Sequence, residues 1–174
     1  MIIRKSTAEI EKMANAGRIV ADTIALLQEH IRPGVSTGEL DELADDYIQS
    51  QGGTSSFKGY RGYPASICTS PNDMVVHGIP NGRTVSEGDI LSIDVGVVLD
   101  GFVADSAYTF AVGEISADAQ RLLDTCQAAL PFRWAKTSGS ESPSARRTNS
   151  NRTSKATATT ARTRFAIPPP RTAR

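Results

Sequence analysis

The chain has 174 residues, of which 39% are hydrophobic, and its 19 basic side chains balance its 19 acidic ones. This length fits one domain with a sizeable core. The composition excludes a collagen or a coiled coil, and no apolar run reaches the roughly 18–20 residues of a membrane span. The charged start, MIIRKSTAEIEK, argues against a secretory signal, and two cysteines are too few for a disulfide scaffold. We therefore expect a cytoplasmic protein that does not bind membranes.

The neutral balance hides two segments of opposite charge. Residues 1–130 carry 18 acidic and 9 basic side chains, whereas residues 131–174 carry 1 acidic and 10 basic ones. The second segment contains 14 Ser and Thr residues and lacks Leu, Val, Met and Cys. Such a segment buries too little apolar surface to offset its ordering entropy. We therefore predict a folded domain over 1–130 and a disordered basic tail over 131–174.

The first part of the domain predicts two helices, each beginning with a capping box, Ser6 with Glu9 and Ser36 with Glu39. The pairs Pro33-Gly34 and Gly52-Gly53 mark their ends. Apolar residues recur at helical spacing in the first helix: Ile10, Met13, Ala14, Gly17, Ala21, Ile24, Leu27 and Ile31. In the second helix they are Leu40, Leu43, Ala44, Tyr47 and Ile48. The opposite face is acidic, and we interpret it as a solvated surface: Asp41, Glu42, Asp45 and Asp46.

The middle of the domain predicts short strands and a long hairpin. After a loop over 57–63, we expect strands at 65–69 and 74–77, separated by a turn at Pro71-Asn72. Residues 90–99 and 102–111 flank Asp100-Gly101, the pattern of a type I′ hairpin. A last helix begins near Ser116, and we expect it to point four side chains inward: Leu122, Leu123, Cys126 and Leu130.

The hairpin places two carboxylates on one face. In a two-residue turn Asp94 opposes Ala107, and Gly96 opposes Asp105, so the two aspartates are diagonal neighbours about 7–8 Å apart at Cα. Their carboxylates could bind one divalent ion or two ions about 3.5–4 Å apart. The small partners Gly96 and Ala107 predict open space beside them. A solvated face is the alternative for each aspartate, and a bulge in place of the turn would shift the register.

His77 lies where the predicted strand over 74–77 enters the loop Gly78-Ile79-Pro80. A single histidine in this position is either a hydrogen-bonded structural residue or a functional one, and its spacing alone does not distinguish these roles.

Several motifs taken together resemble the type I methionine aminopeptidases. They are STGELD (36–41), YRGYPASICTS (60–70), MVVHGIP (74–80) and GDILSIDVGVVLDGFVADSAYTF (88–110). The related peptidases that cut next to proline share the pair of aspartates but not the HGIP context. The resemblance covers residues 1 to about 130. It implies an α+β fold, the N-terminal half of a pita-bread fold in which helices cover an antiparallel sheet.

The resemblance also implies an activity, the metal-dependent removal of the initiator methionine from nascent chains at the ribosome, by a monomer that uses two cobalt, manganese, iron or zinc ions. Asp94 would chelate one ion and Asp105 would bridge both. His77 matches a catalytic histidine that hydrogen-bonds the substrate. Tyr60, Tyr63 and Cys68 match residues of the methionine pocket. In the same resemblance, Phe57 stands where many relatives have a small residue or Cys.

The family's other three ligands, one His and two Glu, belong to its second half. After residue 130 this sequence has no His, and Glu141 is its only acid. Two carboxylates alone do not fix two metal ions, so we expect little or no activity from this chain by itself. Residues 131–174 have two interpretations, a frameshifted segment or a basic tail that binds RNA or the ribosome through phosphates. The second would make the chain a non-catalytic binding protein.

Overall fold

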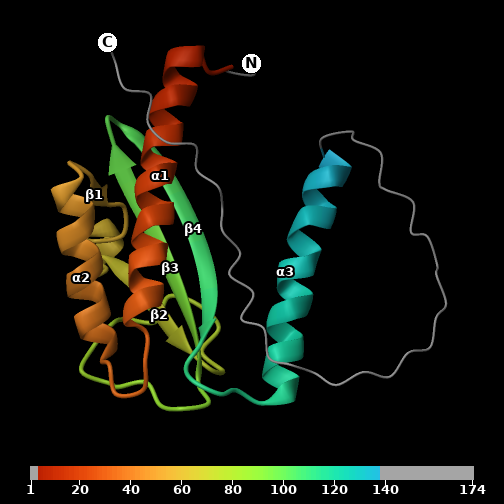
Figure 1. Ribbon diagram of the computed structural model, residues 1–174. Coiled ribbons are helices and arrows are strands. Elements are labelled where there is room, and N and C mark those ends of the chain that lie inside the picture. The colour runs from red at the N-terminus through yellow and green to blue at the C-terminus, as the bar shows by residue number, and fades with distance from the viewer. Residues whose placement is uncertain (1–3, 138–174) are drawn as a thin grey trace, which may run out of the picture.

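The computed structural model describes residues 4–137, so residues 1–3 and 138–174 lie outside the described part. Helices α1 and α2 cover one face of an antiparallel sheet, as predicted for the α+β class (Figure 1). Most of the expected disordered, RNA-binding tail falls outside the described residues. The elements in chain order are α1 (Thr7–His30), α2 (Thr37–Ser50), β1 (Thr54–Ser55), the 3-10 helix η1 (Tyr60–Gly62), β2 (Ile67–Pro71), β3 (Ile90–Leu99), β4 (Phe102–Ala111) and α3 (Ala117–Thr137).

Both predicted capping boxes are present. The Ser6 hydroxyl accepts from the Glu9 N–H at 3.3 Å, and the Glu9 carboxylate accepts from the Ser6 N–H at 2.7 Å. The corresponding distances for Ser36 and Glu39 are 3.1 and 2.8 Å. Each box satisfies backbone N–H groups that the first helical turn leaves unpaired. The sequence therefore determines where α1 and α2 begin.

The buried face of α1 differs from the predicted one. Its buried residues are Ala16, Ile19, Val20, Thr23 and Leu27, whereas Ile10 and Met13 are exposed. The prediction was rotated around the helix because small and apolar residues occur on both sides, and packing against β3 and β4 selects one of them. In α2 the predicted apolar face is correct, since Leu40, Ala44 and Ile48 are fully buried.

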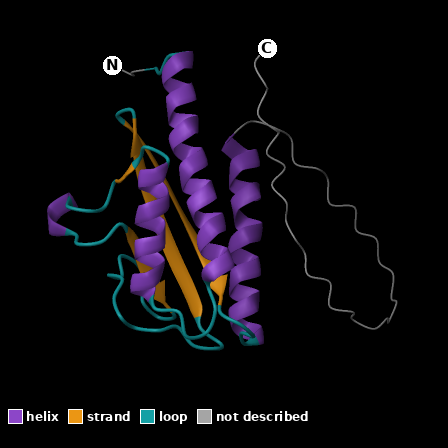
Figure 2. Ribbon diagram, turned by 60° about the vertical axis from the view of Figure 1, so that its left-hand side comes forward, coloured by secondary structure: helices purple, strands orange, loops and turns teal. Residues whose placement is uncertain are grey.

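The hairpin has the predicted register throughout, from Ile90 opposite Ala111 to Leu99 opposite Phe102. Asp100 and Gly101 have φ angles of 50° and 79°, the positive values that a type I′ turn requires. The side chains of β3 that face α1 and α2 are fully buried and form the centre of the core: Leu91, Ile93, Val95 and Val97. Figure 2 shows the two helices in front of the sheet on this side. The other edge of β3 pairs with β1 and β2 in succession.

The predicted strand over 74–77 is wrong, because these residues form a loop after the turn at Pro71-Asn72. Asn72 and His77 both have positive φ angles, 54° and 60°, which an extended strand does not have. Val75 is 85% exposed. The β-like composition of MVVH therefore reflects apolar side chains at a surface and not a buried strand. The sequence prediction also missed β1 and η1, which are very short, and began β2 two residues early.

Helix α3 begins as predicted but does not point its apolar side chains inward. Leu122 is 54% exposed and Cys126 is exposed, while Leu123 is half-buried. The helix continues through residue 130 to Thr137 and lies beside the β4 edge of the sheet (Figure 1). Its expected fourth inward residue, Leu130, has no described side chain. None of the helices in the part of the chain that the structure describes is long and apolar enough to cross a membrane.

Candidate active site

The two aspartates project from the face of the sheet that α1 and α2 leave uncovered. Asp94 opposes Ala107, and Gly96 opposes Asp105, so the predicted diagonal arrangement is present in the backbone. Residues directly opposite each other in an antiparallel ladder share a face, so Asp94 and Asp105 belong to the same side of the hairpin. The two acidic side chains therefore come from neighbouring strands that the Asp100-Gly101 turn holds in register.

Asp94 is the more constrained of the two carboxyl groups. Burial, reinforced by the negative charge of Asp105, raises the pKa of Asp94, and the positive charge of His77 offsets part of this rise. The Oδ1 atom of Asp94 is buried and has no hydrogen-bond partner among the described residues. A buried carboxylate oxygen without a donor is costly, and a bound cation is one way to satisfy it.

The open space predicted beside the aspartates is closed at one end. A Cβ atom placed on Gly96 would collide with the Ser56 hydroxyl and would lie 2.8 Å from the Phe57 ring. The N–H of Ser56 also donates to the carbonyl of Gly96 at 3.0 Å. The prediction of an empty space was therefore wrong here, since Gly96 is small because another segment of the chain packs against it. Phe57 and Tyr63 meet there edge to face, with ring centroids 6.4 Å apart.

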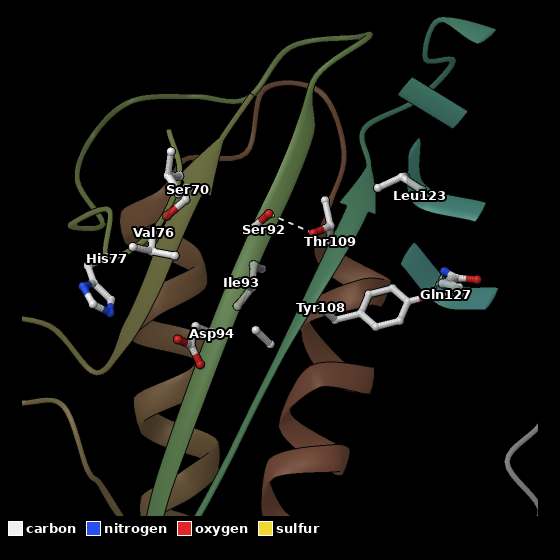
Figure 3. A pocket seen from close by; sticks show the side chains of 12 residues that line it. Ser70, Val76, His77, Ser92, Ile93, Asp94, Tyr108, Thr109, Leu123 and Gln127 are labelled. Carbon is white, nitrogen blue, oxygen red and sulfur yellow. Dashed lines mark hydrogen bonds between the residues drawn. The ribbon is translucent and has the colours of Figure 1, made fainter. Parts of the chain in front are cut away.

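A hollow of about 240 Å³ lies at the other end of this face. Its lining includes Asp94, Ala107 and Thr109 from the sheet, Val76 and His77 from the loop, and Gln127 from α3. In Figure 3, Asp94 lies on the middle strand between His77 on one side and Gln127 on the other. The Gln127 amide donates to the Tyr108 hydroxyl at 2.5 Å, which connects α3 to β4.

Gly78 fixes the loop that carries His77. Its carbonyl accepts from the Thr69 N–H at 2.9 Å, and its own N–H donates to the Ser70 hydroxyl at 3.1 Å. A side chain at this position would overlap the carbonyl oxygen of Thr69 and the sulfur of Met74. The HGIP segment therefore depends on a glycine directly after His77, which brings the exposed imidazole to the rim of the hollow.

The three predicted pocket residues have different surroundings. Cys68 is buried and lies directly opposite Asp94 in the ladder of β2 and β3, and burial raises the pKa of its thiol. Tyr63 is half-buried, and burial raises the pKa of its phenol above the usual range. Tyr60 is 63% exposed on η1, where the guanidinium of Arg61 lies 5.4 Å from its ring centroid. The structure thus brings Tyr63 and Cys68 together, while Tyr60 lies in contact with solvent.

Asp41 and Asp45 were interpreted as part of a solvated surface, and the structure corrects this. Asp41 Oδ1 accepts from the N–H groups of Ser66 and Ile67 at 2.8 and 2.9 Å. Asp45 accepts from the Ser66 hydroxyl at 2.7 Å and pairs with Lys58 at 2.8 Å. Glu42 and Asp46 are exposed as expected. The spacing of four residues between Asp41 and Asp45 places them on one helix face, but Glu42 and Asp46 have the same spacing, so the sequence alone does not distinguish the two pairs.

This face offers two of the side chains that a divalent cation could bind. Two carboxylates on one face, one of them with a buried oxygen that lacks a donor, are ligands for hard and borderline ions. Within residues 4–137, however, no group of three or more His, Cys, Asp or Glu side chains is arranged to hold a metal ion. Within this part of the chain the two aspartates therefore have no third His, Cys, Asp or Glu arranged with them to hold an ion.

Known proteins resemble this chain in sequence and in fold. The sequence matches Metallopeptidase family M24 over residues 11–132. It is 52% identical over 124 residues to the methionine aminopeptidase of Clostridium acetobutylicum, covering 71% of this chain and 50% of that protein. It is 50% identical over 130 residues to methionine aminopeptidase 1 of Bacillus subtilis, covering 75% and 52%. The crystal structure of the methionine aminopeptidase from Thermotoga maritima superposes with a TM-score of 0.74 at 36% identity, covering 76% and 53%.

The chain therefore belongs to metallopeptidase family M24. Over its first 130 or so residues it is a type I methionine aminopeptidase-like domain with a partial pita-bread fold. It spans about half the length of the curated relatives it matches.

Proposed function

We propose that residues 1 to about 130 are the part of a methionine aminopeptidase that contributes two of its metal-binding carboxylates and one wall of its substrate site. The reaction would remove the initiator methionine from nascent polypeptides in the cytoplasm. The observation that carries this proposal is the Asp94–Asp105 pair, held on one open face with a buried oxygen that lacks a donor. The identity to methionine aminopeptidases, above 50% with one relative, supports the choice of substrate.

Asp94 and Asp105 would hold the metal, which by resemblance is a pair of cobalt, manganese, iron or zinc ions. A divalent ion at such a site acts as a Lewis acid toward a peptide carbonyl and increases the acidity of water. The Asp94 carboxyl supplies the more buried of the two ligands, and the rigid hairpin keeps both carboxylates on one face without a conformational change. This preorganisation is the main contribution that the described residues make.

His77 is the proposed catalytic histidine that would hydrogen-bond the substrate. It lies at the rim of the hollow on a loop that Gly78 fixes, and its charge acts on Asp94. Tyr63 and Cys68, with Phe57 beside them, offer the aromatic and sulfur-containing wall that suits a methionine side chain. Tyr60 is exposed on η1 and would join this wall only if its ring turned toward Tyr63.

The 174-residue chain supplies two of the five ligands expected from the resemblance, and we propose that by itself it has little or no activity. The test is release of methionine from a Met-Ala-Ser peptide with added Co²⁺ or Mn²⁺. A full-length relative, such as the Bacillus subtilis protein, assayed under the same conditions is the positive control. Turnover by this chain comparable to that control would refute the proposal of an incomplete site.

A further inference from the structure

Asp41 makes an unusual contact for a residue on a helix surface. It is half-buried on α2, and a single oxygen, Oδ1, accepts two backbone N–H groups, those of Ser66 at 2.8 Å and Ile67 at 2.9 Å. Ile67 is the first residue of β2, and Ser66 directly precedes it. Burial raises the pKa of Asp41, and the two N–H donors offset part of this rise. A partly buried carboxylate costs free energy that an apolar residue would not, so what Asp41 contributes is the acceptor for these two N–H groups.

The hydroxyl of Tyr63 continues this set of contacts. It lies 3.0 Å from the carbonyl oxygen of Ile67 and 3.0 Å from that of Gly78. A phenol has one proton to donate, so the two carbonyls share it. Ile67 is thus held at its N–H by Asp41 and at its carbonyl by Tyr63, and the same hydroxyl reaches the loop residue Gly78. The contacts run from α2 through the start of β2 to the loop of the candidate site.

Two residues of this set, Ile67 and Gly78, adjoin the candidate active site. Ile67 directly precedes Cys68, which lies opposite Asp94 in the ladder of β2 and β3. Gly78 directly follows His77, which lines the hollow with Asp94. A shift of the start of β2 would therefore move Cys68 and, through Tyr63, the backbone beside His77.

We infer that Asp41 is a positioning residue for this site: through the backbone of Ile67 and the hydroxyl of Tyr63 it sets the positions of Cys68 and His77 relative to Asp94. The inference rests on the proposed function for the purpose of the site, and on the hydrogen bonds alone for the mechanical connection. Neighbouring Asp45 has a different role, because it pairs with the side chains of Lys58 and Ser66 and does not contact the backbone of β2.

The mechanical connection is tested by the alkylation rate of Cys68, which is buried. The measurement uses the full chain with Cys126→Ser, so that iodoacetamide reports on one thiol. The variants are Asp41→Ala, Asp41→Asn and Tyr63→Phe. The matched control is Ser36→Ala, which removes the cap of the same helix without touching β2. Each variant is measured at the temperature at which its fraction unfolded equals that of the control. Global unfolding then contributes equally to every alkylation rate.

We expect Asp41→Ala to raise the alkylation rate of Cys68 about tenfold over the control, because two backbone N–H groups lose their acceptor. Asp41→Asn keeps an acceptor oxygen and should restore most of the protection. Tyr63→Phe should raise the rate severalfold, and it carries the test if Asp41→Ala does not fold. The inference would be overturned if Cys68 were alkylated at the same rate in Ser36→Ala as in whichever of Asp41→Ala and Tyr63→Phe are folded.

A second readout separates this inference from the proposed function. Binding of a Met-Ala-Ser peptide to the unmodified chain is followed by the resonances of His77, identified by comparison with His30→Gln. If Asp41→Ala weakens peptide binding and Ser36→Ala does not, the result supports both the role of Asp41 and the proposed function. If the unmodified chain shows no shift of His77 with peptide, the proposed function fails, while the alkylation result still decides the role of Asp41.

Discussion

Gly78→Ala is the substitution that most sharply tests how the His77 loop is held. The added methyl group would overlap the carbonyl oxygen of Thr69, a backbone atom that cannot rotate away, and the sulfur of Met74. Overpacking of this kind costs about 1–3 kcal/mol. Displacing the loop also removes the 2.9 Å hydrogen bond from the Thr69 N–H to the Gly78 carbonyl, worth about 1 kcal/mol. We therefore expect the free energy of unfolding to fall by about 2–4 kcal/mol.

The assay is urea unfolding followed by circular dichroism, with Gly82→Ala as the matched control. Gly82 lies on the same connection between β2 and β3, its added Cβ would meet nothing within 4 Å, and its φ is not positive. The control should change stability by no more than about 0.5 kcal/mol. If Gly78→Ala is as stable as Gly82→Ala, then the loop does not pack against β2 as described, and the reasoning about His77 fails.

Three further predictions concern the helices and the hairpin. Gly17→Ala should stabilise the domain by about 0.5–1 kcal/mol in thermal unfolding, because the site is in the interior of α1 with nothing within 4 Å of the new Cβ; a loss of stability would contradict this packing. Gly101→Ala should destabilise the hairpin by about 1–2 kcal/mol, since φ is 79° there, and an unchanged urea midpoint would argue against the type I′ turn. For Asp41, the folded pKa is raised above the unfolded value, so its contribution to stability is greatest below the unfolded value of 3.8 and falls as the pH rises through the folded pKa. Asp41→Asn should therefore remove a decrease in stability over that acidic range, and parallel pH profiles for the two proteins would refute the shift.

Local sequence patterns predicted the parts of the fold that local chemistry controls. The capping boxes at Ser6 and Ser36 place both helix starts, and Asp100-Gly101 with two β-rich flanks determines the hairpin and its register. The aspartate pair follows from that register by counting residues alone. These features depend on interactions within a few residues or across one turn.

Features that depend on distant segments could not be predicted in the same way. The apolar run MVVH has strand composition, but its position is set by Gly78 packing on Thr69. Gly96 suggested open space, yet Ser56 and Phe57 fill it. A pattern of period 3.6 also indicates which residues share a helix face, but not which face packs on the sheet, as α1 demonstrates.

Asp41 illustrates the same limit for polar residues. In the sequence it is one of the four acids on the predicted acidic face of α2, and such a face is usually solvated. Its role depends on where β2 begins, because Ile67 is 26 residues further along the chain and the helical pattern does not encode its position. Buried backbone N–H groups need acceptors. Which N–H groups are buried near Asp41 is known only once the position of β2 is known.

Binding of Mn²⁺, measured by electron paramagnetic resonance of the free ion, tests the central claim most directly. The claim is that Asp94 and Asp105 form the metal-binding part of an incomplete methionine aminopeptidase site. The account predicts weak, saturable binding by the chain, reduced about tenfold or more in Asp94→Asn and Asp105→Asn. The control Asp46→Asn, which removes an exposed carboxylate from α2, should bind as the unmodified chain does. Binding that is the same in Asp94→Asn and Asp46→Asn would contradict the claim.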